Sequence, residues 1–120
     1  MNILIVDDNA MYRTLAQRSL AQMDYSVKGI DPASAFEVLR VCMDFKPNLV
    51  ILDFHLPRCN AETLALILKE DPSFQPLKIL CVSSSRDPEV EARMLRAGVD
   101  RFSHKGSMAS LLEDVRTLLA

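Results

Sequence analysis

The sequence lacks the features that would place it among membrane, secreted or nucleic-acid-binding proteins. No apolar run approaches the ~20 residues that a membrane-spanning helix needs. Asp7 and Asp8 end the apolar start of the chain too early for a secretory signal. Basic residues do not cluster, and the net charge of −2 argues against nucleic acid as a direct partner, because phosphate binding needs a basic face. These absences predict a cytoplasmic protein with no membrane contact.

Cysteine is present but sparse. Cys42, Cys59 and Cys81 are an odd number of thiols and lack the spacing of metal sites. A disulfide framework is therefore not expected, and reduced thiols fit a cytosolic protein.

Length and composition are those of one small globular domain, expected to occupy residues 1–120. The chain has 49% hydrophobic and 25% charged residues, which is ordinary for a soluble fold. A domain of this size buries roughly two-thirds of the surface of its unfolded chain, enough for a core without disulfides or structural metals.

Five short apolar segments predict β-strands. Residues 2–6, 48–52 and 78–82 are continuous runs of aliphatic residues, typical of strands buried on both faces. Residues 25–30 alternate in polarity, which suits a strand near an edge, and residues 101–104 are short and mixed.

Helical segments are expected between these strands. Asp31 and Asp87 each precede a proline, which predicts an N-cap followed by proline in the first turn. Asn60 and Ser107 are further candidate N-caps, and Gly98 predicts a helix end. Apolar residues recur at helical spacing in two of these segments: Phe36, Leu39 and Met43 in one, and Leu111, Leu112, Val115, Leu118 and Leu119 in the other.

Strands and helices alternating five times predict an α/β fold with a five-stranded parallel sheet and helices on both faces. Right-handed connections leave few topologies, and the flavodoxin-like strand order 2-1-3-4-5 is the favoured one for five strands. Ligands in such sheets bind beyond the carboxyl ends of the strands, where the strand order reverses.

Polar residues follow the strands at that edge of the sheet. The strand at 2–6 ends in Asp7 and Asp8, and the strand at 48–52 ends in Asp53, so three carboxylates are expected to converge. Ser83 and Lys105 follow the strands at 78–82 and 101–104. Carboxylates this close need a compensating charge, and oxygen ligands select Mg²⁺ or Ca²⁺ rather than zinc. A metal, a lysine and a hydroxyl around a carboxylate are what phosphoryl transfer to an aspartate requires.

Each of these residues alone has a plainer explanation. Asp8 could be only a helix N-cap, and Asp53 a capping or turn residue. Lys105 could be a solvated surface lysine, and Ser83 a turn former. The plainer explanations do not account for the joint placement of these residues at the ends of four strands.

Four motifs resemble those of the response-regulator receiver domain, the phosphoacceptor module of two-component signalling, over essentially the whole chain. Residues 3–8 resemble the acidic pair after the first strand, and residues 52–57 resemble the phosphoacceptor motif. Residues 82–84 resemble the hydroxyl-small pair after the fourth strand, and residues 102–105 the aromatic and lysine of the fifth.

The resemblance implies a role for each residue. Asp53 would be phosphorylated by a histidine kinase or a histidine phosphotransfer protein, and Lys105 and Ser83 would contact the phosphoryl oxygens. Mg²⁺ would be held by Asp8, Asp53 and the backbone carbonyl of His55, with Asp7 acting mainly through metal-bound water.

The resemblance also implies a switch and a set of partners. Ser83 would move inward after phosphorylation and Phe102 would rotate into the vacated space. The surface of the fourth helix, the fifth strand and the fifth helix would then change. Because Phe102 has no hydroxyl, its coupling would be steric; it could also be only a packed aromatic. Partners implied beside the phosphodonor are an output domain or an effector protein, and dimerisation through this surface is left open.

The sequence departs from the family pattern in three respects. Gly106 follows Lys105 where many members have proline after a cis bond, so a trans bond is expected here. Ala61 replaces a common glycine. His55 and Ser85 lie two residues beyond Asp53 and Ser83, beside the path of the attacking water, so His55 is expected to affect the hydrolysis rate.

Other functions compete with the phosphorylation switch, which is not expected to be an enzyme beyond its own phosphorylation and dephosphorylation. The alternative is a degenerate receiver that acts as a constitutive protein-interaction module, which the departures at Ala61 and Gly106 would suit. An aspartate-nucleophile phosphatase usually has a second acid at the position of His55. A flavin-binding domain would need glycine and hydroxyl residues after the first strand, where Asp7 and Asp8 stand.

Overall fold

A computed structural model describes all 120 residues and contains one parallel sheet in the order β2-β1-β3-β4-β5. The strands are β1 Asn2–Val6, β2 Ser26–Ile30, β3 Leu49–Asp53, β4 Lys78–Ser83 and β5 Arg101–His104. The helices are α1 Ala10–Ala21, α2 Ala35–Phe45, α3 Ala61–Glu70, α4 Pro88–Arg96 and α5 Met108–Leu119, with a short 3₁₀ turn, η1, at Pro72–Phe74. The predicted fold class and strand order are confirmed.

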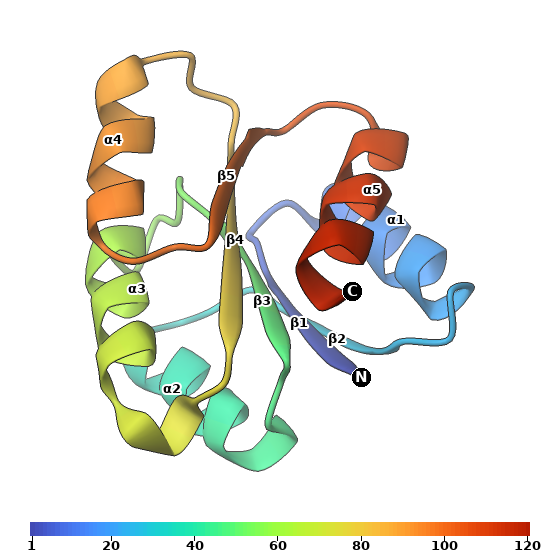
Figure 1. Cartoon of the computed structure of the whole chain (residues 1–120), viewed down its shortest axis with the longest axis horizontal. Coiled ribbons are helices and arrows are strands. Elements are labelled where there is room, and N and C mark those ends of the chain that lie inside the picture. Colours follow the sequence, from blue (N-terminus) through green and yellow to red (C-terminus); the bar gives the residue numbers. More distant parts are fainter.

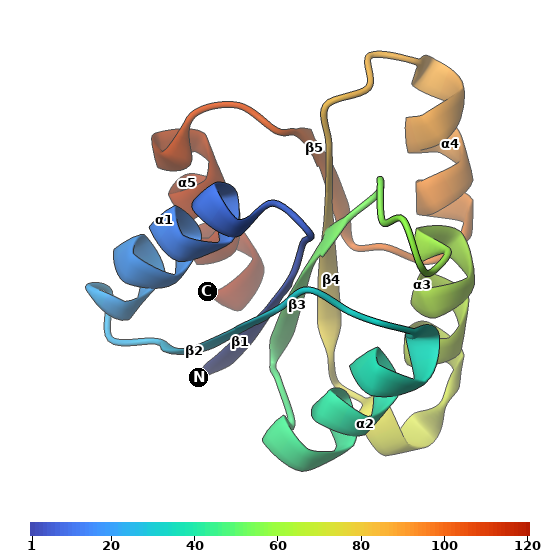
Figure 2. The same ribbon diagram turned by 180° about the vertical axis from the view of Figure 1, so that it is seen from behind.

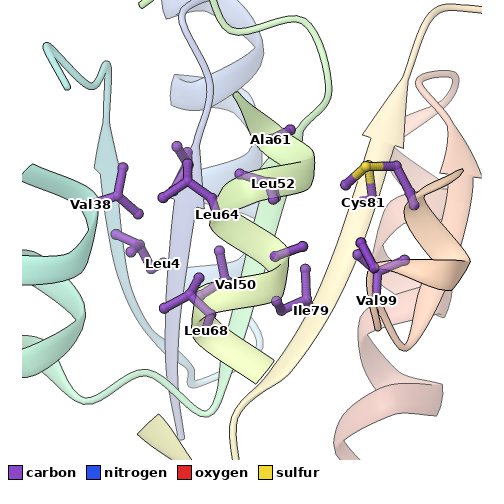
Figure 3. Close-up of a cluster of buried hydrophobic side chains, with 14 of the residues drawn as sticks. Leu4, Val38, Val50, Leu52, Ala61, Leu64, Leu68, Ile79, Cys81 and Val99 are labelled. Carbon is purple, nitrogen blue, oxygen red and sulfur yellow. The ribbon is translucent and has the colours of Figure 1, made fainter. Parts of the chain in front are cut away.

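The helices divide unequally between the two faces of the sheet. Helices α1 and α5 lie side by side on one face, and α2, α3 and α4 cover the other (Figures 1 and 2). Each face has its own core. The larger cluster has 17 buried residues under α2, α3 and α4, and Figure 3 shows part of it. The smaller one has 10, under α1 and α5.

Burial of the central strands explains their composition. All five residues of β3 are buried, as are four of five in β1 and five of six in β4. Alternate residues enter opposite cores: Leu4 and Val50 lie in the larger cluster, and Ile3 and Ile51 in the smaller. Both faces therefore require apolar side chains, and the alternation seen in a half-buried strand is absent.

Three of the four predicted helix starts are confirmed, and one is wrong. Asn60, Asp87 and Ser107 cap α3, α4 and α5 with their side-chain oxygens. Helix α2 begins after Ser34 instead of Asp31, because the Ser34 hydroxyl accepts the backbone N–H of Glu37.

The buried face of α2 follows only part of the apolar spacing in the sequence. Val38 and Cys42 are the buried residues of α2. Phe36 is 83% exposed and Met43 is 54% exposed. Helical spacing alone left the rotation of the helix undefined, and contact with the sheet selected the stripe of Val38 and Cys42.

The end of α4 and the peptide bond after Lys105 are as expected. Gly98 follows α4 with a φ of 102°, a conformation that favours glycine. The peptide bond between Lys105 and Gly106 is trans. All three cysteines are free thiols. No helix has the length and apolar character needed to cross a membrane.

Candidate functional site

The turn after β1 places the first two acids. Asp7 is 1% exposed, whereas Asp8 is exposed. The Asp7 carboxylate accepts the backbone N–H of Asn9 at 2.8 Å, and the Asn9 side chain accepts the N–H of Tyr12 at 3.0 Å to cap α1. Arg13 donates to the backbone carbonyl of Asp7 at 2.7 Å. These local bonds fix how α1 leaves the strand and which way Asp7 points.

Asp53 is the last residue of β3 and is 2% exposed. Strand β3 lies between β1 and β4, so its carboxyl end lies beside the turn that carries Asp7 and Asp8. One carboxylate oxygen from each of Asp7, Asp8 and Asp53 lies within 4.8 Å of the others. The predicted convergence of the three acids is therefore observed.

Strands β4 and β5 bring a hydroxyl and an ammonium group to the same edge. Ser83 ends β4 with no exposed surface, and its carbonyl accepts the Lys105 N–H at 2.8 Å. The Lys105 ammonium nitrogen is 2.7 Å from Asp7 Oδ2 and 3.7 Å from Asp53 Oδ2. The Lys105 ammonium thus partly neutralises the two buried carboxylates of Asp7 and Asp53.

This neutralisation is incomplete. Burial and the neighbouring Asp7 raise the pKa of Asp53 from 3.8 to about 6; the Lys105 ammonium and the His55 backbone amide oppose that rise. Asp53 Oδ1 is buried and accepts no hydrogen bond, whereas the buried Asp7 Oδ2 has the Lys105 ammonium 2.7 Å away. Buried oxygens without donors are costly unless a further positive charge is supplied. The donor set is made only of oxygen atoms, so these residues fit a hard divalent cation such as Mg²⁺.

Ser83 has two partners on its hydroxyl group. Its Oγ accepts the backbone N–H of Ser85 at 3.0 Å and lies 3.2 Å from Nε2 of His55. His55 is exposed and follows Asp53 by two residues, so its ring lies at the mouth of the acidic cluster. The structure therefore connects the β3 and β4 exits through one side-chain hydrogen bond.

Comparison with known protein families decides the identity of the fold. A family model of the response regulator receiver domain matches residues 3–116. The chain belongs to this family.

Known receivers agree with this assignment. The chain is 26% identical to the response regulator GacA of Pseudomonas viridiflava over its whole length and 56% of that protein. It superposes on the receiver domain of Klebsiella pneumoniae RstA with a TM-score of 0.87 at 24% identity, covering 99% and 98% of the two chains. A CheY-like receiver of Methanospirillum hungatei gives 0.83 at 26% identity, covering 97% and 90%. The chain spans about half the length of the curated relative GacA.

The remaining expected residue of the receiver, Phe102, lies in β5 at the edge of the larger core. Its ring is half-buried, packs against that cluster and meets His104 edge to face, with centroids 6.2 Å apart. The other face of β5 is tied to α5, where Asp114 pairs with Arg101 at 2.9 Å and accepts the Ser103 hydroxyl at 2.6 Å. Phe102 therefore belongs to the strand that joins the site to α4 and α5.

Sequence reasoning missed one residue of the site. The ring of Tyr12, in the first turn of α1, lies under the Lys105 ammonium, with 4.5 Å between the nitrogen and the ring centroid. Burial, followed by the charges of Asp7, Asp53 and Asp114, raises the pKa of Tyr12 to about 12, so its phenol stays protonated. Its place after the acidic pair was the available signal, but apolar and aromatic residues in a first turn are usually core.

One cavity of the receiver lies away from these residues. It has a volume of about 390 Å³ and is bounded by the end of α2, η1 and the residues that precede β3 and β4. The phosphoacceptor motif is therefore at the opposite end of the strands from this cavity.

Proposed function

We propose that this receiver is a phosphorylation-dependent switch of a two-component system in which Asp53 accepts a phosphoryl group from a histidine kinase or a histidine phosphotransfer protein. The observation that carries the proposal is a buried aspartate with an unpartnered oxygen and an ammonium group 3.7 Å from its second oxygen. A carboxylate in this setting can act as a nucleophile, and the ammonium group beside it can stabilise the negative charge of an incoming phosphoryl group.

The proposed step is an in-line displacement at phosphorus. An Asp53 oxygen forms a bond to phosphorus as the phosphorus–nitrogen bond of the donor phosphohistidine breaks. The imidazole leaves with the electron pair of that bond and takes up a proton. Lys105 and the Ser83 hydroxyl would bind phosphoryl oxygens, which lowers the free energy of the charge that spreads over them.

The cation site belongs to the same proposal. Asp8, Asp53 and the backbone carbonyl of His55 would hold Mg²⁺ directly, and Asp7 would act mainly through metal-bound water. When bound, Mg²⁺ supplies positive charge against the donor's phosphoryl oxygens and relieves the repulsion among the three carboxylates.

The output would be a change of the surface formed by α4, β5 and α5. Ser83 must leave its contact with His55 to reach a phosphoryl oxygen, and space beside the β4 exit then becomes available to Phe102. Related proteins carry different activities beside a matched segment, among them a protein-glutamate methylesterase and a cyclic di-GMP phosphodiesterase response regulator. An attached output domain, an effector protein or a second receiver would bind this surface and respond to the change. The phosphodonor would lie in the cytoplasm.

The decisive experiment uses acetyl phosphate as a small phosphodonor. The protein is incubated with acetyl phosphate and Mg²⁺, and its intact mass is followed. One phosphoryl adduct is expected, absent in Asp53→Asn and after addition of a chelator. An unmodified mass at every Mg²⁺ concentration would refute the proposal. The alternative of a degenerate, constitutive interaction module would then gain support, but the complete set of site residues does not favour it.

A further inference from the structure

Lys105 needs a support that its own backbone does not provide. Its ammonium lies at the end of a flexible four-carbon chain, and the next residue, Gly106, is the most permissive residue for backbone conformation. A Cβ at Gly106 would meet no atom closer than 3.9 Å, so neighbouring groups do not confine this turn tightly. The side chain of Lys105 is nevertheless only 17% exposed.

The support comes from helix α1. The Lys105 nitrogen lies between three groups: Asp7 Oδ2 at 2.7 Å, Asp53 Oδ2 at 3.7 Å and the Tyr12 ring centroid at 4.5 Å. The two carboxylates pull the ammonium into the acidic cluster. The ring face carries the negative side of its quadrupole, so it attracts the ammonium without offering a competing hydrogen-bond acceptor.

Tyr12 is itself held by the turn that orients Asp7. Asn9 connects the two, since its N–H donates to Asp7 and its side chain accepts the N–H of Tyr12. The aromatic ring also packs against the smaller core under α1 and α5. Its position relative to the acidic cluster is thus fixed from both sides.

From this arrangement we infer that Tyr12 is a positioning residue for phosphoryl transfer: its ring holds the Lys105 ammonium where the phosphoryl oxygens of the donor arrive. The inference rests on the proposed function and adds a residue to its machinery. Tyr12 does not touch the reacting atoms. It acts through Lys105, so its contribution should depend on the presence of that lysine.

The test compares rates of phosphorylation by acetyl phosphate in Mg²⁺ for wild type, Tyr12→Leu and Tyr12→Phe. Loss of the ring should lower the second-order rate constant about fivefold to tenfold, and phenylalanine should restore most of it because the ring face is kept. Tyr25→Leu is the matched control, since Tyr25 packs against the same core and has no ammonium group over its ring, and its rate should stay near that of wild type.

A double-mutant cycle separates positioning from general damage. In a Lys105→Met background, Tyr12→Leu should have almost no further effect. A loss of similar size in both backgrounds, or an unchanged rate in Tyr12→Leu, would overturn the role of Tyr12 while leaving the proposed function intact. Wild type that never gains a phosphoryl group would overturn the proposed function and this role together.

A spectroscopic measurement tests the contact in wild type itself. Protons over an aromatic ring resonate upfield, so the ε-methylene protons of Lys105 should be shifted upfield in the NMR spectrum of wild type. The shift should persist in Tyr12→Phe and disappear in Tyr12→Leu. Unshifted ε-protons in wild type would refute the contact.

Discussion

Replacing Asp53 with asparagine should stabilise the fold of this receiver, even though it removes the phosphoacceptor. Asp53 is 2% exposed, and one of its oxygens accepts no hydrogen bond. Burial and the charge of Asp7 raise its pKa from 3.8 to about 6. A raised carboxyl pKa means that the folded state disfavours the charged form. Asparagine keeps the shape of the side chain and removes that charge.

The size of the gain follows from the shift. A rise from 3.8 to about 6 is worth about 3 kcal/mol of unfolding free energy, since each pKa unit corresponds to about 1.4 kcal/mol. The contribution of Asp53 to stability depends on pH in the opposite direction from that of a salt-bridged aspartate. The folded state binds this proton more tightly, so the penalty is absent below the unfolded pKa of 3.8. It grows as pH rises and is complete above about 6.

The assay is urea unfolding of wild type and Asp53→Asn in chelator, followed by far-UV circular dichroism because the chain has no tryptophan. We expect the variant to be more stable by about 3 kcal/mol near pH 8, and by less than about 1 kcal/mol near pH 4. Asp44→Asn is the matched control, since Asp44 is exposed in α2 and forms no ion pair. Its stability should follow wild type at each pH.

Magnesium provides an independent arm of the same test. A cation that binds the folded state raises the unfolding free energy of wild type with its concentration. Because Asp53→Asn lacks one of the three carboxylates, its stability should respond less, and the gap between the two proteins should narrow. Equal stability of the two proteins near pH 8 in chelator, or a gain that is the same near pH 4, would refute the reasoning.

Three further predictions concern other parts of the receiver. His55 lies beside the path of the attacking water, so His55→Ala should change the rate of phosphoryl loss by roughly fivefold, about 1 kcal/mol in the barrier; an unchanged rate of loss of the phosphoryl adduct would contradict it. Asp114→Asn weakens the pairing with Arg101 and should cost about 1 to 3 kcal/mol in urea unfolding, whereas a cost near zero would show that this tie between β5 and α5 is unimportant. Gly98→Ala places a Cβ at a φ of 102° and should cost about 1 to 2 kcal/mol, and a variant as stable as wild type in thermal unfolding would exclude backbone strain there.

The core strands and the acidic cluster were predictable because their signals are local. A strand buried on both faces must be apolar at every position, so β1, β3 and β4 are visible as continuous runs. In a parallel sheet the carboxyl ends share one edge, so the acids that end β1 and β3 had to meet once the strand order was known. The strand order itself came from the right-handedness of the connections and the order favoured for five strands, since no residue in the sequence encodes it alone.

The errors came from features that depend on contacts. Asp31 and Ser34 are both good N-caps, and the docking of α2 on the sheet selected Ser34. Asp31 pairs instead with Arg58 at 3.0 Å. Phe36 fits the helical spacing as well as Val38 does, yet only one of these two stripes can face a sheet.

By itself the sequence determined the fold class, the five strands, the acids at their ends and the family to which the chain belongs, because short-range patterns and motifs carry that information. Only the tertiary structure decided which side chains of the site contact one another. It placed the Lys105 ammonium between Asp7 and Asp53, the Tyr12 ring beneath it and the His55 ring on Ser83. These contacts join residues up to 98 positions apart. They depend on side-chain rotamers and on how the helices pack, and no residue spacing in the sequence indicates either.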